Sequence, residues 1–106
     1  GNMTVTSAAI TADATVNSII PLLLVKIVDA ITLNTDLTLE VSADGGSNWF
    51  SVTLIDLGTV KSGYKVYGPS APIDTSTHAG TSPKMRTKTL NNKMVHFPGA
   101  AMKWAA

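Results

Sequence analysis

Hydrophobic and polar residues alternate strictly along residues 36–42, in the middle of the chain. Leu37, Leu39 and Val41 fall on one face, and the polar residues between them fall on the other. A period of two is what a β-strand with one buried and one solvated face requires. The pattern therefore predicts a half-buried antiparallel strand over residues 36–42, and similar patterning predicts a second strand over residues 49–55.

A basic segment, residues 84–90, shows the same alternation. Three cationic side chains share one face of this predicted strand, namely Lys84, Arg86 and Lys88. Weaker strand patterns cover residues 4–8, 62–67 and 73–76. The last strand is predicted to cover residues 94–97, to break at Pro98-Gly99 and to resume over residues 100–104. Turn-forming residues separate these segments, and Asn91-Asn92 is predicted to form a hairpin turn before the last strand.

Together with a run around Leu22, these segments give about eight short strands, and helical periodicity is hard to find. The expected fold class is therefore all-β, an antiparallel β-sandwich or jelly roll of about eight strands. The length of 106 residues predicts one domain over residues 1–106, in which residues 1–18 form an N-terminal arm or the first strands.

Residues 22–29 break the alternation, because both faces of this predicted strand are apolar over most of its length. A strand of a lone two-layer fold should have one solvated face, so a second cover is expected. One interpretation places a neighbouring subunit there, with Leu23, Val25 and Ile27 as interface candidates. The alternative is a central strand whose outer face is roofed by a loop or by the N-terminal arm.

Composition supports a partly covered surface, because charged residues make up only 14% of the chain against about 25% in an average domain. The charge is also uneven: residues 1–60 carry a net charge of −5 and residues 61–106 a net charge of +6. Such asymmetry is found in nucleic-acid-binding proteins. Pairing of acidic with basic strands is the simpler interpretation, so no nucleic-acid partner is expected.

The sequence argues against several classes of protein. The chain has no cysteine, which excludes disulfides and thiolate metal sites. The longest apolar run, residues 19–25, is too short to cross a bilayer, so no membrane insertion is expected. No glycine-rich loop opens a helix, which leaves nucleotide binding without support. The chain begins Gly1-Asn2-Met3, which indicates a tag remnant, a processed product or a fragment of a longer protein.

One sharp motif lies between the first two predicted strands, over residues 42–49. Its signature positions are Ser42, Asp44, Gly46 and Trp49, in the pattern S-x-D-x-G-x-x-W. Short oxygen-bearing side chains can accept hydrogen bonds from free turn amides, and glycine permits the positive φ of a tight loop. The motif resembles the Asp-box, which implies a structural hairpin away from any active site.

The wider chain resembles a domain common at the C-terminal ends of tailed-phage virion proteins, including tail fibres and minor structural proteins. The stretches that carry the resemblance are residues 28–37 (VDAITLNTDL), 40–46 (EVSADGG), 80–86 (GTSPKMR), 89–93 (TLNNK) and 102–104 (MKW). The resemblance implies a β-sandwich in a virion appendage, assembled as a homo-oligomer, with a trimer expected. Other virion proteins are the implied partners, and the resemblance supplies no catalytic residues.

The residues that could carry catalysis or bind a metal form no convincing set. Catalysis by a nucleophile needs a base beside it, and the chain has only two histidines, His78 in a loop-like stretch and His96 in the last predicted strand, where a structural histidine is the common outcome. Asp36 and Glu40 share a strand face about 13 Å apart, which is too far for a glycosidase pair. Asp44 could join Asn34, Thr35 and Asp36 around calcium, but turn formation explains these residues equally well. No enzyme, no cofactor and no metal site is expected.

The alternative function is a carbohydrate- or receptor-binding domain that mediates attachment to a host surface. Tyr64 and Tyr67 are the ligand-binding candidates, because aromatic faces beside polar groups are typical of sugar sites. Three residues apart on a strand, they point to opposite faces, so one at most is expected to be available.

Overall fold

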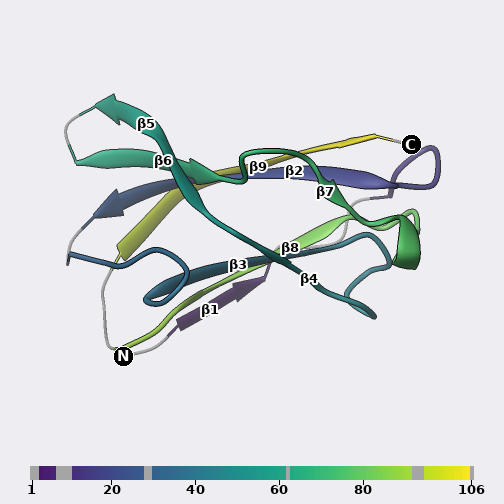
Figure 1. Cartoon of the computed structure of the whole chain (residues 1–106), viewed down its shortest axis with the longest axis horizontal. Coiled ribbons are helices and arrows are strands. Elements are labelled where there is room, and N and C mark those ends of the chain that lie inside the picture. Colours follow the sequence, from purple (N-terminus) through teal and green to yellow (C-terminus); the bar gives the residue numbers. More distant parts are fainter. Residues whose placement is uncertain (1–2, 7–10, 28–29, 62, 92–94, 106) are drawn as a thin grey trace.

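The computed structural model describes residues 3–6, 11–27, 30–61, 63–91 and 95–105. These residues form two antiparallel sheets that lie face to face (Figure 1). In sheet order, the first sheet consists of β1 (Met3–Thr6), β8 (Lys84–Thr89), β3 (Leu37–Ser42) and β4 (Phe50–Val52). In the second sheet, β2 (Ser18–Ile27) pairs with β6 (Tyr64–Gly68), β7 (Ile73–Asp74) and β9 (Val95–Ala105), and β5 (Ile55–Lys61) pairs with β6. The predicted all-β, antiparallel β-sandwich is confirmed.

Alternating side chains build the core between the sheets. Strands β3 and β8 alternate between buried and half-buried residues along most of their length. The buried set among the described residues comprises Ala12, Val16, Ile19, Leu23, Val25, Leu37, Leu39, Val41, Ala43, Val52, Leu54, Tyr67 and Met85. Because one face of each strand is removed from water, a slip by one residue would expose this set, and the register is fixed.

The strand predicted over residues 49–55 is interrupted. Its first part is β4 in the first sheet, and its continuation is β5 in the second sheet, so the chain changes layer at Thr53 and Leu54 (Figure 1). Asn34 fixes this crossing: its side-chain oxygen accepts from the Leu54 amide at 2.7 Å, and its side-chain nitrogen donates to the Leu54 carbonyl at 3.1 Å. Asn34 has a φ of 65°, a conformation that asparagine tolerates better than most residues.

The predicted hairpin at Asn91-Asn92 is wrong. Strand β8 lies in the first sheet and β9 in the second, so this connection changes layer. Asn91 has a φ of 58° and donates to the Asp36 carboxylate at 2.7 Å. The last predicted strand is β9, which continues through Pro98-Gly99. Its pairing with β2 is irregular at the predicted break, between Gly99 opposite Leu24 and His96 opposite Lys26.

Leu23 and Val25, which were predicted to contact a neighbouring subunit, lie in the core of their own chain. Leu23 is 2% exposed and Val25 0% exposed, because both point between the two sheets of their own chain. They are therefore not available to a partner in this fold, and the side chain of Ile27 lies outside the described residues. The alternate residues of β2, Ile20 and Leu22 among them, are half-buried on the outer face.

The weaker strand predictions are near the observed elements. Residues 4–8 overlap β1, residues 62–67 overlap β6, and residues 73–76 overlap β7. A short 3-10 helix, η1 (Ser76–His78), follows β7. Strand β2 begins at Ser18, and Val16 forms a bridge with Gly80, so residues 16–18 belong to the sandwich.

Candidate functional site

The Asp-box hairpin between β3 and β4 is held by side-chain hydrogen bonds. The buried Ser42 hydroxyl accepts from the Gly46 amide at 2.9 Å and donates to the Asp44 carboxylate at 2.7 Å. The backbone amide and side-chain amide of Asn48 donate to the two Asp44 oxygens at 2.9 and 2.7 Å. The hydrogen bonds expected from Ser42 and Asp44 are therefore present, and they replace ladder bonds that a turn cannot make.

The same contacts set the charge state of Asp44. Burial raises the pKa of its carboxyl group. Hydrogen bonds from the Asn48 side chain, the Ser42 hydroxyl and the amides of Asn48 and Asp44 together lower it by more, so the pKa falls to about 2. Asp44 is therefore an ionised acceptor near neutral pH. It serves the turn, and the described residues contain no group of three carboxylates or histidines that could hold a metal ion.

The hairpin also docks onto a loop distant in sequence. The Gly45 amide donates to the Ser82 carbonyl, and the Ser82 amide donates to the Ala43 carbonyl, both at 3.0 Å. Gly80 lies against Ala43, where an added Cβ would fall 2.6 Å from the carbonyl oxygen. The hairpin is thereby fixed to the chain that leads into β8.

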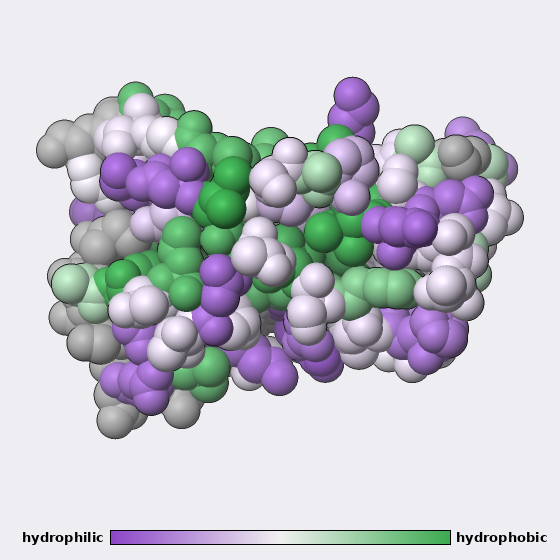
Figure 2. Space-filling model, viewed as in Figure 1, coloured by the Kyte–Doolittle hydropathy of each residue, from purple (hydrophilic) through white to green (hydrophobic). Residues whose placement is uncertain are grey.

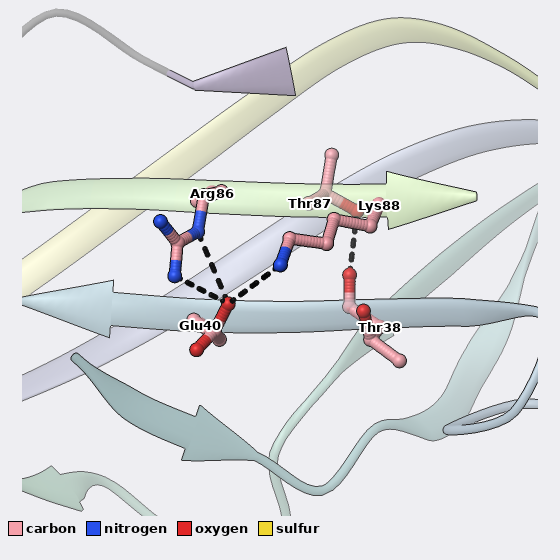
Figure 3. A network of polar contacts seen from close by, with 5 residues as sticks. All are labelled: Thr38, Glu40, Arg86, Thr87 and Lys88. Atoms are coloured by element: carbon pink, nitrogen blue, oxygen red, sulfur yellow. Dashed lines mark hydrogen bonds and ion pairs between the residues drawn. The ribbon is translucent and has the colours of Figure 1, made fainter. Parts of the chain in front are cut away.

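The outer face of the first sheet is polar, and an ion-pair cluster lies at its centre (Figure 3). Nε and Nη2 of Arg86 donate to Glu40 Oε1 at 3.1 and 2.8 Å, and the Lys88 ammonium lies 3.9 Å from the same oxygen. The Arg86 guanidinium also stacks 4.1 Å from the Trp49 ring centroid. The interpretation that acidic and basic strands pair is confirmed, because Glu40 lies directly opposite Arg86 in the β3–β8 register.

The outer face of the second sheet is apolar. Pairing places Leu24 opposite both Val66 and Gly99, and Leu22 opposite Ala101, so these residues share the outer side of the sheet. We call this surface the apolar face and define it by Ile20, Leu22, Leu24, Ile55, Leu57 and Val66. Hydrophobic residues also gather where β5 crosses the front of the molecule (Figure 2).

Strand β5 supplies the most exposed hydrophobic residues of the described chain. Ile55 is 38% exposed, Leu57 45% and Val60 64%. Leu57 and Leu22 together cover Gly68, where an added Cβ would lie about 3 Å from both side chains. Sequence reasoning missed these residues, because it assigned only the start of β5 to a strand. The signal available was the pattern of alternate apolar residues Ile55 and Leu57.

The two tyrosines separate as their spacing predicts. Tyr67 is 6% exposed in the core, and burial raises the pKa of its phenol, with a further increase from Asp56. Tyr64 is half-buried, and the Lys26 ammonium lies 5.7 Å from its ring centroid. Tyr67 therefore cannot offer an aromatic face to a ligand in this fold, and Tyr64 already has a cation over its ring.

The remaining candidate residues are not brought together. His78 lies on η1, with its ring centroid 5.9 Å from that of Phe50. The side chain of His96 lies outside the described residues. Asp36 is buried and accepts from the Thr32 amide at 2.9 Å, in a network separate from that of Glu40. Among the described residues, no helix is long and apolar enough to cross a bilayer.

Comparisons with family models, with curated proteins and with solved structures found no match for this chain. The fold itself therefore defines the class: an all-β protein with two packed antiparallel sheets. Function has to be argued from the surfaces described above.

Proposed function

We propose that this chain is a non-catalytic structural module of a phage virion, and that it assembles as a homo-oligomer. The virion assignment rests on the resemblance of its motif stretches to tailed-phage appendage proteins. A trimer and partners among other virion proteins are part of the same proposal. The surface proposed to contact a second copy is the apolar face.

The contrast between the two outer surfaces is the observation that supports assembly. The first sheet presents hydroxyl and charged groups outward, including Thr38, Glu40 and Arg86. The second sheet presents the apolar face, with Leu57 45% exposed. Isolated exposed apolar residues are ordinary, but a contiguous group on one face of a small domain is typical of an interaction surface.

The placement of charge on the outer side of the second sheet favours another copy of this chain as the occupant. Among the residues whose exposure the structure describes, pairing places the exposed side chains of Lys26, Lys103 and Asp74 on this side, opposite Tyr64, Ile20 and Ser18 respectively. They lie toward the two ends of β2, leaving the centre apolar. In a trimer, the apolar faces of the three copies can meet around the symmetry axis with their centres buried, while the ammonium groups remain at the solvated rim.

The test is the mass of the purified chain in solution, measured by sedimentation equilibrium and light scattering. We expect the wild-type chain to form a discrete oligomer. Leu57→Asp and Ile55→Asp should each lower the mass toward that of a monomer, because burying an unpaired carboxylate at an interface is costly. Both positions are already partly exposed, so the monomer should stay folded.

The matched control is Thr4→Asp, which adds the same charge on the polar face of the first sheet opposite Lys88. Its mass should equal that of the wild-type chain. A wild-type chain that stays monomeric at micromolar concentration would refute the proposal, as would an oligomer that resists both substitutions on β5.

A further inference from the structure

A hollow of about 380 Å³ opens on the outside of the first sheet, beside the ion-pair cluster. We call it the β3–β4 hollow. It is lined by Asn34, Thr38, Leu39, Glu40, Ser51, Val52 and Thr53. Its volume lies within the range of about 300–1,000 Å³ that small-molecule sites occupy.

The hollow exists because the β3–β4 ladder is short. The register pairs only three residues of each strand, from Leu39 opposite Val52 to Val41 opposite Phe50. Beyond Val52 the chain turns away toward the second sheet, which leaves space beside the first half of β3. The two hydrogen bonds between Asn34 and Leu54 hold the departing chain in place. This side of the hollow is therefore formed before any ligand binds. Binding then has to order fewer groups and loses less conformational entropy.

The lining of the hollow is largely polar. Leu39 and Val52 are only 1% and 4% exposed, because their side chains point into the core between the sheets. The hydroxyls of Thr38, Ser51 and Thr53 can each donate and accept hydrogen bonds, and the threonine methyl groups add a small apolar surface. A ligand here would meet several adjacent hydrogen-bonding groups.

Glu40 gives the hollow an oriented acceptor. Arg86 and Lys88 both contact Oε1, and no hydrogen bond within the described part of the chain uses Oε2. Figure 3 shows this second oxygen pointing away from β8, toward the β4 side where the hollow lies. The two cations thus fix the carboxylate while leaving one oxygen for a ligand, an arrangement that supporting residues provide at preorganised sites.

We infer that the β3–β4 hollow binds one neutral pyranose residue of a glycan. A sugar ring carries several adjacent hydroxyl groups, which can donate to Glu40 Oε2 and exchange hydrogen bonds with the hydroxyls of Thr38, Ser51 and Thr53. An anionic ligand is disfavoured, because the lining carboxylate repels it and the nearby cations are already paired with Glu40. This inference does not rest on the proposed assembly.

The experiment is a titration of the ¹⁵N-labelled chain of 106 residues, followed by amide chemical shifts. The probes are the methyl glycosides of glucose, galactose, mannose and N-acetylglucosamine, up to about 50 mM, because a shallow site is expected to bind in the millimolar range. N-acetylneuraminic acid serves as the anionic probe. At least one neutral sugar should cause saturable shifts at Thr38, Ser51 and Thr53.

Two variants separate binding from folding. Ser51→Leu fills the hollow from an exposed position and should abolish the shifts while leaving the thermal midpoint unchanged. Glu40→Gln should weaken binding at least about tenfold, because hydrogen bonds to a charged acceptor are the stronger ones. Thr6→Ala, on the same sheet but outside the hollow, should bind as the wild-type chain does.

Three results would overturn the inference. The first is the absence of saturable shifts with every neutral sugar, and the second is binding that survives Ser51→Leu. The third is binding of N-acetylneuraminic acid alone. Oligomer mass measured on the same samples keeps this result separate from the proposed function, since neither variant alters the apolar face.

Discussion

Replacing Ser42 with alanine tests whether the Asp-box hairpin is held by its side chains. The Ser42 hydroxyl is buried, and it joins the turn amides to Asp44 through bonds to Gly46 at 2.9 Å and to the carboxylate at 2.7 Å. Alanine removes this bridge without adding bulk. The Gly46 amide, the Asp44 amide, which lies 3.3 Å from the hydroxyl, and the Asp44 carboxylate then each lose one partner.

The expected loss of unfolding free energy is about 2–3 kcal/mol. A net hydrogen bond contributes about 0.5–1.5 kcal/mol and one to a charged group about 1.5–3 kcal/mol, while an unsatisfied buried donor costs about 1–3 kcal/mol. These contributions overlap, because water can reach part of Asp44. For a domain of about 100 residues the loss corresponds to a fall in thermal midpoint of about 10 °C.

Urea denaturation followed by circular dichroism measures this loss. Ser47→Ala is the matched control, because Ser47 lies in the same hairpin and is exposed, so its replacement should change stability by less than about 0.5 kcal/mol. Equal stability of the two variants would refute the reasoning that Ser42 anchors the hairpin.

Acid titration checks the electrostatic part of the same argument. The folded pKa of Asp44, about 2, lies below its ordinary value of 3.8. Its ionised form therefore stabilises the fold above pH 3.8, and this contribution disappears as the pH falls through about 2. Solvent screening at this partly exposed group limits the effect to about 1 kcal/mol. Ser42→Ala should raise the Asp44 pKa, and an unchanged carboxyl titration by NMR would contradict this.

Two further pairs of substitutions test the docking of the hairpin and the ion-pair cluster. Gly80→Ala should destabilise the chain by about 1–3 kcal/mol in urea denaturation, because the new Cβ would lie 2.6 Å from a main-chain carbonyl oxygen. Gly99→Ala, whose Cβ would meet nothing nearer than 4.0 Å, is its control, and equal losses would refute the steric argument. Arg86→Ala should cost about 1–2 kcal/mol through lost stacking on Trp49 and a lost ion pair. Lys88→Ala removes only a 3.9 Å contact and should cost less than about 0.5 kcal/mol, so a larger loss there would contradict the assignment.

Two parts of the fold could be predicted because their signals are local. The alternation in β3 and β8 identifies the buried face, since successive side chains of a strand point to opposite sides. The hairpin motif encodes its own hydrogen bonds, because Ser42, Asp44 and Gly46 lie within five residues of one another. The uneven charge predicted contacts between the two halves of the chain, without naming the pairs. Asp56 of the acidic half and Lys65 of the basic half form such an ion pair at 3.2 Å.

The β3–β4 hollow could not be predicted, because its lining depends on where β4 stops pairing and the chain leaves the sheet. Asn34 and Leu54, twenty residues apart, decide that point through two hydrogen bonds. The period-two pattern does not reveal a contact between residues so far apart in the sequence. It therefore predicted a single strand over residues 49–55. The same limit applies to Asp36, which alternation assigned to a solvated face but which is buried beside Asn91.

By itself, the sequence determined the strand character of the chain, the buried faces of β3 and β8, and the turn at the Asp-box. Tertiary structure decided which sheet each strand joins and which side of β2 faces outward. Leu22 and Leu23 are equally apolar, yet only Leu23 lies in the core. The physical reason is that period-two patterning distinguishes faces only where one face is polar. On a strand that is apolar on both sides, the packing of the second sheet makes the choice.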